Sequence, residues 1–153
     1  MKETVRIDNQ LLRAMNGNAW HGPALFELLQ GITAEQAQQY SIEGVHNVWE
    51  LVLHITTWQK VTIKRLSGEN YEPNDKDNWP DSIDYSTQNW EHAMEELYRT
   101  YQSLREKILH FPESELDSPV TGQHYTFYVL LHGLIQHNLY HAGQIALLRK
   151  KLK

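Results

Sequence analysis

Two histidines four residues apart are the most informative feature of this sequence. His137 and His141 lie in the run QHNLYHAGQI (residues 136–145). On a helix, a spacing of four residues places both imidazoles on one face, one turn apart. Imidazole nitrogens bind divalent first-row metal ions, and such an ion needs a further protein ligand. His54, in an apolar run far earlier in the chain, is the best candidate for that third ligand.

A purely structural role is the alternative for these residues. Nine histidines in 153 residues make a chance pair at this spacing easy, and any one buried imidazole can hydrogen-bond to a backbone carbonyl or a tyrosine. A buried polar group without a partner costs on the order of 1–3 kcal/mol. Three imidazoles on facing buried helices therefore favour one common partner, which a metal ion would supply.

The elements that must position these histidines read as helices, because apolar residues recur at helical spacing and no segment alternates like a strand. A polar stretch from Glu69 to Ser82 is too long for a hairpin turn and predicts a crossover. We expect an all-α four-helix bundle with long crossover loops, formed by a single domain over residues 1–153. The predicted helices are Val5–Met15, a short stretch from Trp20 to Gly31, Val45–Leu66, Tyr85–His110 and His124–Leu152.

The composition of the chain argues against several classes of function. The chain has no cysteine, which excludes disulfides, thiolate metal sites and a cysteine nucleophile. The formal net charge is −5, and the one notable basic cluster, Arg149–Lys153, suits the negative end of a final helix better than a nucleic-acid surface. No signal-peptide core or membrane-spanning stretch is visible. We expect a cytoplasmic protein with neither nucleic acid nor membrane as a partner.

Three stretches of the sequence resemble the DinB branch of the DinB/YfiT-like superfamily, bacterial metal-binding four-helix bundles. They are NAWHGPAL (residues 18–25), HNVWELVLHI (residues 46–55) and HGLIQHNLYHAGQI (residues 132–145). They occur in the family's order along nearly the whole chain. The resemblance implies a metal ion held by one histidine on the second helix and an HxxxH pair on the fourth, which here are His54, His137 and His141.

The same resemblance bears on the cofactor, the reaction and the assembly. It implies one divalent transition metal, usually zinc or nickel, and imidazole ligands also suit iron or copper. Some relatives transfer low-molecular-weight thiols onto electrophiles, and others are described only as metal-dependent hydrolases. The expected substrate is therefore a small molecule or a thiol. Relatives often pair as two-fold dimers, so we also expect a homodimer.

Several other residues are candidates for supporting roles. Glu50, one turn before His54, is the best carboxylate for a catalytic acid or base, with an exposed ion-pairing role as its alternative. His21 and His46 stand at predicted helix starts, where capping or a place at the rim of a pocket is expected. Gln144 and Asn138 could orient ligand imidazoles. Gly133 and Gly143 could leave room for water or substrate beside the fourth helix.

Two functions from different classes are consistent with these residues. The first is a metal-dependent hydrolase or low-molecular-weight thiol transferase that uses the three histidines. The second is a non-catalytic, metal-stabilised bundle that binds a ligand or partner. A metal-free interaction protein with core histidines is a third reading. An open coordination position would separate the first from the second, because a structural metal site has none.

Overall fold

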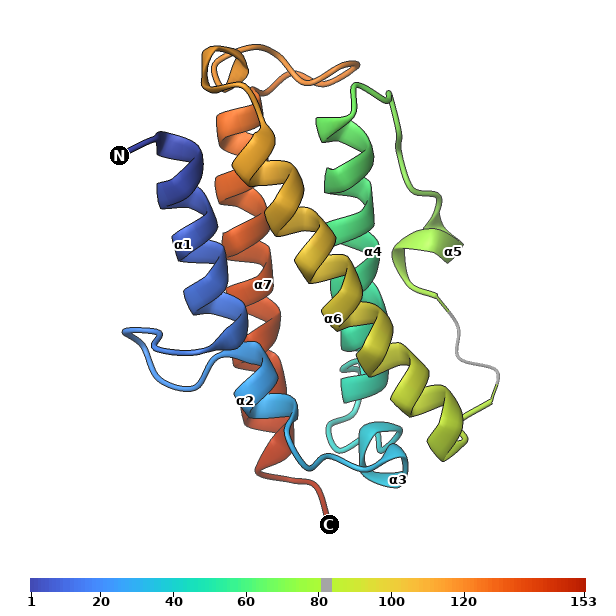
Figure 1. The fold of residues 1–153 in the computed structure, drawn as a ribbon. Helices are drawn as coiled ribbons and strands as arrows, with labels where there is room; N and C mark the ends of the chain where they lie inside the picture. The colour runs from blue at the N-terminus through green and yellow to red at the C-terminus, as the bar shows by residue number, and fades with distance from the viewer. Residues whose placement is uncertain (81–83) are drawn as a thin grey trace.

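Four long helices form the bundle, and the computed structural model describes residues 1–80 and 84–153. Within those two ranges there is no β-strand, so the predicted all-α four-helix bundle is confirmed (Figure 1). Ser82, at the end of the predicted crossover, lies outside the described residues. The long helices are α1 (Glu3–Asn16), α4 (Val48–Leu66), α6 (Thr87–His110) and α7 (Phe127–Arg149). The short elements are α2 (Leu25–Leu29), α3 (Ala34–Ala37), α5 (Asp75–Asn78) and the 3-10 helix η1 (Glu113–Glu115).

The order of the helices around the bundle places α4 beside α7. Helix α4 contacts α6 and α7, and α1 contacts the same two helices, so α1 and α4 stand at opposite corners. Figure 1 shows α4 and α6 running in one direction and α1 and α7 in the other. The bundle therefore departs from simple up-down order, because the connection containing α5 returns the chain along α4 before α6 begins. Helices α4 and α7 remain antiparallel neighbours.

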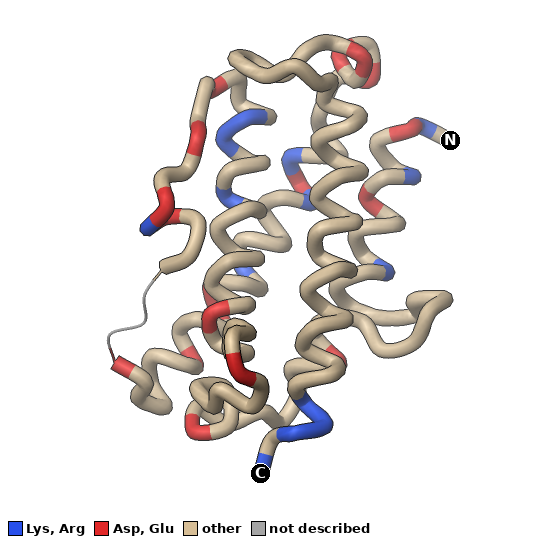
Figure 2. Tube along the Cα trace, turned by 180° about the vertical axis from the view of Figure 1, so that it is seen from behind, with Lys and Arg blue, Asp and Glu red and all other residues tan. Residues whose placement is uncertain are grey.

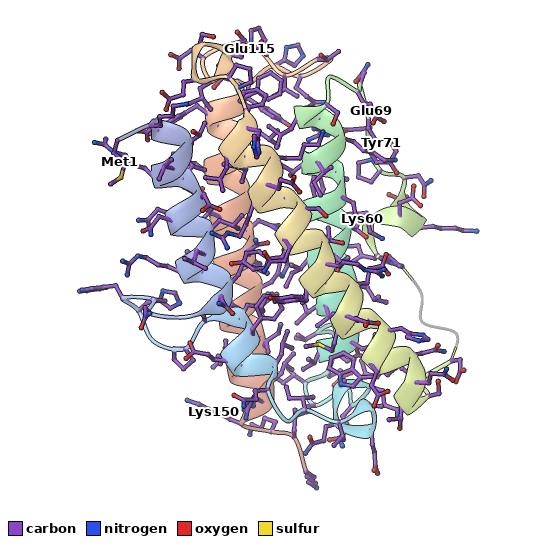
Figure 3. The ribbon with its side chains drawn as sticks, viewed as in Figure 1. Met1, Lys60, Glu69, Tyr71, Glu115 and Lys150 are labelled. Carbon is purple, nitrogen blue, oxygen red and sulfur yellow. The ribbon has the colours of Figure 1, made fainter. Side chains whose placement is uncertain are left out.

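Apolar side chains from all four long helices fill the space between them (Figure 3). Helix α1 turns one stripe inward, whereas α4 and α7 are apolar around most of their circumference. Burial of such faces supplies most of the stability of a helix in a protein. The fully buried large residues include Ile7, Leu11 and Met15 of α1, Trp49 and Ile55 of α4, Leu97, Tyr101 and Leu104 of α6, and Ile145 of α7.

Capping side chains set the helix starts. Asn47 Oδ1 accepts a hydrogen bond from the Glu50 amide (2.9 Å), and Glu50 Oε2 accepts one from the Asn47 amide (3.1 Å). This reciprocal capping box starts α4 at Val48, three residues later than the sequence pattern suggested. Thr126 likewise caps α7, which begins at Phe127 rather than His124. A second capping box, between Thr33 and Gln36, starts α3.

In Figure 2, the basic colour on α7 appears only at its C-terminal end. The C-terminal basic cluster follows α7, and Arg149 donates hydrogen bonds to the carbonyl oxygens of Leu28 and Gln30 (2.9 Å for Gln30). Basic residues at the end of a helix complement its dipole, and here Arg149 also satisfies carbonyls at the end of α2. Over the described residues, no helix has both the length and the apolarity required to cross a bilayer.

Candidate metal centre

The three predicted histidines meet between α4 and α7. His54 comes from the middle of α4, and His137 and His141 come from the middle of α7. The Nε2 atom of His137 lies 3.0 Å from Nε2 of His54 and 3.1 Å from Nε2 of His141. The candidate ligand atoms of all three residues lie within 4.8 Å of one another. The structure therefore brings together side chains that are far apart in the sequence.

The connection between α4 and α6 orients His54. Its Nδ1 atom lies 2.6 Å from the backbone carbonyl oxygen of Asn78, at the end of α5. A carbonyl can only accept, so Nδ1 carries the proton and the lone pair of His54 is on Nε2. The Asn78 side chain is held in turn, because its Oδ1 atom accepts a hydrogen bond from Trp58 Nε1 (2.8 Å).

His141 is oriented from its own helix. Its Nδ1 atom lies 2.6 Å from Oε1 of Gln144, three residues later. The amide oxygen is an acceptor, so this contact also places the proton on Nδ1 and the lone pair on Nε2. Hydrogen bonds of this kind fix the orientation of metal-binding imidazoles in many proteins. Gln144 therefore occupies the orienting position that the sequence suggested.

His137 differs because its Nδ1 atom is buried and has no hydrogen-bond partner among the described residues. Its Nε2 atom faces two nitrogen atoms that both carry lone pairs. A proton on Nε2 could serve only one of them, and with the proton on Nδ1 three buried lone pairs would face one another. A cation between the three Nε2 atoms would satisfy all three lone pairs together.

The spacing of the nitrogens suits such an ion. Zinc–imidazole bonds of about 2.0–2.1 Å place two neighbouring nitrogen ligands roughly 3–3.4 Å apart. The measured separations of 3.0 and 3.1 Å agree with this range. The donor set is three neutral nitrogens with no carboxylate or thiolate, which suits zinc, nickel, copper or iron rather than magnesium or calcium.

Burial also prepares the imidazoles to bind a metal. Loss of hydration is the main reason why the pKa of His54 falls to about 4 and that of His137 to about 3, from an ordinary value of 6.5. The pKa of His141 is lowered for the same reason, although its hydrogen bond to Gln144 opposes the shift. All three side chains are consequently neutral near neutral pH, and the neutral form is the one that binds metal.

Aromatic rings cover one face of the His54 imidazole. The indole of Trp79 stacks on the His54 imidazole with ring centroids 3.8 Å apart and an angle of 4° between the planes. His46 stacks on Trp79, with centroids 3.6 Å apart and an angle of 8°. The three rings form a continuous stack, so His46 supports the cover of the site from the start of α4. His46 therefore lies at the edge of the candidate site, behind Trp79.

Glu50 makes its hydrogen bonds at the N-terminal end of α4. Besides the Asn47 amide, its carboxylate contacts the hydroxyl of Tyr40 (2.5 Å) and Nδ1 of His46 (2.9 Å). The hydrogen bond to Glu50 is the main cause that raises the pKa of Tyr40. The link from Glu50 to the three histidines runs through His46 and Trp79. A catalytic role for this carboxylate stays a prediction.

The other residues that the sequence suggested for supporting roles lie in different parts of the structure. His21 is exposed in the connection between α1 and α2, and Gly143 is exposed on the outer face of α7. The buried amide nitrogen of Asn138 lies 3.4 Å from Sδ of Met15. Gly133 borders a cavity beside His137.

Sequence reasoning missed two residues of the centre. Asn78 acts through a backbone carbonyl, which any residue could supply, so its type carries no signal. Trp79 was recognisable only as an aromatic anchor within a polar connection. Trp58 is half-buried against the core, and its ring centroid lies 5.9 Å from that of His137.

Residues 19–145 match the family model of the DinB superfamily. The matched segment contains all three histidines and extends from the connection after α1 into the second half of α7. No curated protein and no solved structure matches the chain. The family match thus stands beside the geometry of the histidines as an independent observation.

Proposed function

Because the chain belongs to the DinB superfamily, we propose that His54, His137 and His141 bind one divalent transition-metal ion and that the ion serves catalysis. The convergence of three imidazoles, with Nε2 of His137 within hydrogen-bonding distance of Nε2 of both His54 and His141, carries this proposal. Zinc or nickel is the expected ion, and iron is a further option that the imidazole ligands would accept.

The proposed reaction is hydrolysis or the transfer of a small thiol. A divalent ion with three neutral imidazole ligands lowers the pKa of a coordinated water or thiol and so supplies a nucleophile near neutral pH. The protein's part is to hold the imidazoles deprotonated and correctly turned. Asn78 and Gln144 hold the protons on Nδ1, and burial keeps the three rings neutral.

The side chains around the centre favour a site that is open on one side. Trp79 covers His54, but a cavity of about 290 Å³ reaches His137 between α4 and α7. Pockets for small molecules are commonly apolar spaces of roughly this size or larger that contain a few polar groups. This access for a substrate favours catalysis over the alternative, a non-catalytic bundle stabilised by a metal.

Metal analysis and cobalt substitution test the proposal. We expect about one zinc or nickel ion per chain after mild purification, measured by elemental analysis. A cobalt-substituted sample should change its visible absorption when a small thiol or a hydroxamate is added, because both bind an open coordination position. A chain that neither carries metal nor takes up zinc or nickel would refute the metal site. A bound cobalt ion that responds to neither ligand would favour the non-catalytic bundle.

A further inference from the structure

The cavity beside His137 has an unusual polar end. Its walls come from α4, α7 and the segment before α7, and most of the lining is apolar. Trp58 and His137 lie at the end next to the metal centre. Arg65, the penultimate residue of α4, and Tyr125 also border the cavity. A space of this kind could hold an elongated apolar molecule, provided that the polar groups have a partner.

Arg65 is a buried cation that is fixed in place. Its side chain is only 2% exposed. Its Nε atom donates to the backbone oxygen of Tyr71 (3.1 Å), and one terminal nitrogen donates to the hydroxyl of Tyr125 (2.5 Å). Guanidinium has five N–H donors, and these two contacts with one to Glu72 use three of them. Among the described residues, two of its donors have no partner, and the phenolic proton of Tyr125 is free for a further acceptor.

Glu72 shows that the Arg65 guanidinium pairs with a carboxylate. Its carboxylate pairs with the second terminal nitrogen of Arg65, although the Glu72 side chain is 66% exposed. Figure 2 shows the acidic residues of this connection beside the basic end of α4, and Figure 3 shows Tyr71 against the same part of α4. A solvated carboxylate gains little from an ion pair and is readily displaced. Arg65, in contrast, has no way to leave its buried position.

Gly133 keeps the middle of the cavity open. A Cβ atom built at Gly133 would meet nothing within 4 Å, and the residue borders the cavity. Glycine costs roughly 1 kcal/mol relative to alanine inside a helix, so this open space has a measurable cost in stability. Gly143 of the same helix also has free space at its Cβ position, but it faces outward and does not border the cavity.

We propose that this cavity binds the non-reacting part of the substrate and that this part is an apolar chain ending in a carboxylate. The carboxylate binds the free donors of Arg65 and Tyr125, and the apolar chain passes Gly133 toward His137. The inference rests on the proposed function in taking the metal centre as the reacting end. The carboxylate site itself needs no metal, so the two proposals can be tested separately.

Calorimetric titration of the full-length chain with octanoate, octylamine and 1-octanol tests the ligand class. Each titration is made on chelator-treated protein and again with one equivalent of zinc. We expect octanoate to bind the metal-free chain at least tenfold more tightly than the amine or the alcohol of the same length. Absence of octanoate binding, or equal affinity for the three compounds, would overturn the inference.

Variants locate the binding. Gly133→Leu fills the cavity and should weaken octanoate binding at least tenfold, whereas the matched variant Gly143→Leu should leave it unchanged. Glu72→Gln removes a competing carboxylate and should strengthen octanoate binding several-fold, a gain that damage to the fold would not produce. Equal loss in both glycine variants, or weaker binding by Glu72→Gln, would contradict the proposed position.

The outcomes separate this inference from the proposed function. Zinc binding by Gly133→Leu, measured by elemental analysis, shows that the metal centre is intact when octanoate binding is lost. A chain that binds octanoate but no metal would overturn the proposed function alone. A chain that binds zinc but never octanoate would overturn the inference alone.

Discussion

The indole of Trp79 lies parallel to the imidazole of His54, with 3.8 Å between the ring centroids. Trp79 follows α5 directly, and the preceding residue, Asn78, accepts the hydrogen bond from His54 Nδ1. Two consecutive residues of the connection between α4 and α6 therefore both contact one histidine. This connection forms part of the metal centre, although its sequence is polar and irregular.

Replacing Trp79 tests the contribution of that cover. Trp79→Ala exposes the His54 ring to water, so the pKa of His54 should rise from about 4 toward its ordinary 6.5. Zinc affinity should fall roughly tenfold, because a less constrained imidazole is a poorer ligand. An NMR titration of the metal-free protein gives the pKa, and Trp20→Ala, at a fully exposed tryptophan, is the control. An unchanged pKa would show that the stacking does not protect His54.

Replacing the three histidines tests which of them bind the ion. His54→Ala, His137→Ala and His141→Ala should each weaken zinc binding by more than about 100-fold, because each removes a bond to the metal. His92→Ala and His110→Ala change exposed residues and should bind zinc as the parent does. Competition with a chromophoric chelator measures these affinities. Equal zinc retention by all five variants would assign the trio a structural role.

Gln144 offers a test of imidazole orientation. Gln144→Ala removes the acceptor for His141 Nδ1 and should weaken zinc binding by about 10–100-fold. Gln144→Glu should restore or increase the affinity, because a carboxylate accepts the same proton and raises the basicity of the ring. Gln136→Ala, at an exposed position of α7, is the matched control. A loss in Gln144→Glu as large as in Gln144→Ala would show that this hydrogen bond does not tune the ligand.

The low pKa values of the buried histidines predict how stability depends on pH. Unfolded histidines titrate near 6.5, whereas the pKa is about 4 for His54 and about 3 for His137 in the fold. Between these values the unfolded chain binds more protons, so acid favours unfolding. The free energy of unfolding of the metal-free protein should fall below pH 6.5, by about 1.4 kcal/mol per pH unit for each such histidine.

Urea unfolding of the metal-free protein between pH 7 and pH 4.5 measures this dependence. The variant His54→Gln lacks one titrating group and should show a shallower decline over the same range. Carboxylates also titrate toward the acid end, and they are identical in both proteins, so the difference isolates His54. Parallel curves for parent and variant would contradict the predicted coupling. Above pH 6.5 these histidines should have no effect.

The long helices were predictable because their apolar patterns are strong. The positions of their ends were less predictable. The predicted start at Val45 missed the reciprocal hydrogen bonds of Asn47 and Glu50, which begin α4 at Val48. The start of α7 was misplaced for a similar reason, since Thr126 caps it. Periodicity marks where a helix can continue, whereas a single side-chain contact decides where it begins.

The three histidines were predictable as one group because residue type, spacing and helix burial all agreed. Apart from Gln144, the residues around them were not. Asn78 contributes a backbone oxygen, and nothing in the sequence marks Arg65 as buried. Its hydrogen bonds go to Tyr71, Tyr125 and Glu72, which come from two different connections of the fold. Such contacts between distant segments leave no pattern in a single sequence.

The antiparallel placement of α4 and α7 has a consequence for the mechanics of the chain. His54 and His137 are 83 positions apart, so an ion bound by both would act as a cross-link that closes a long loop. In the chain-entropy account, a covalent link over such a loop stabilises a fold by roughly 4 kcal/mol. The sequence has no cysteine and can form no disulfide. The stability of this fold would then depend on the supply of metal ions and not on the oxidation of thiols. A chelator would destabilise it as a reductant destabilises a disulfide-bonded protein.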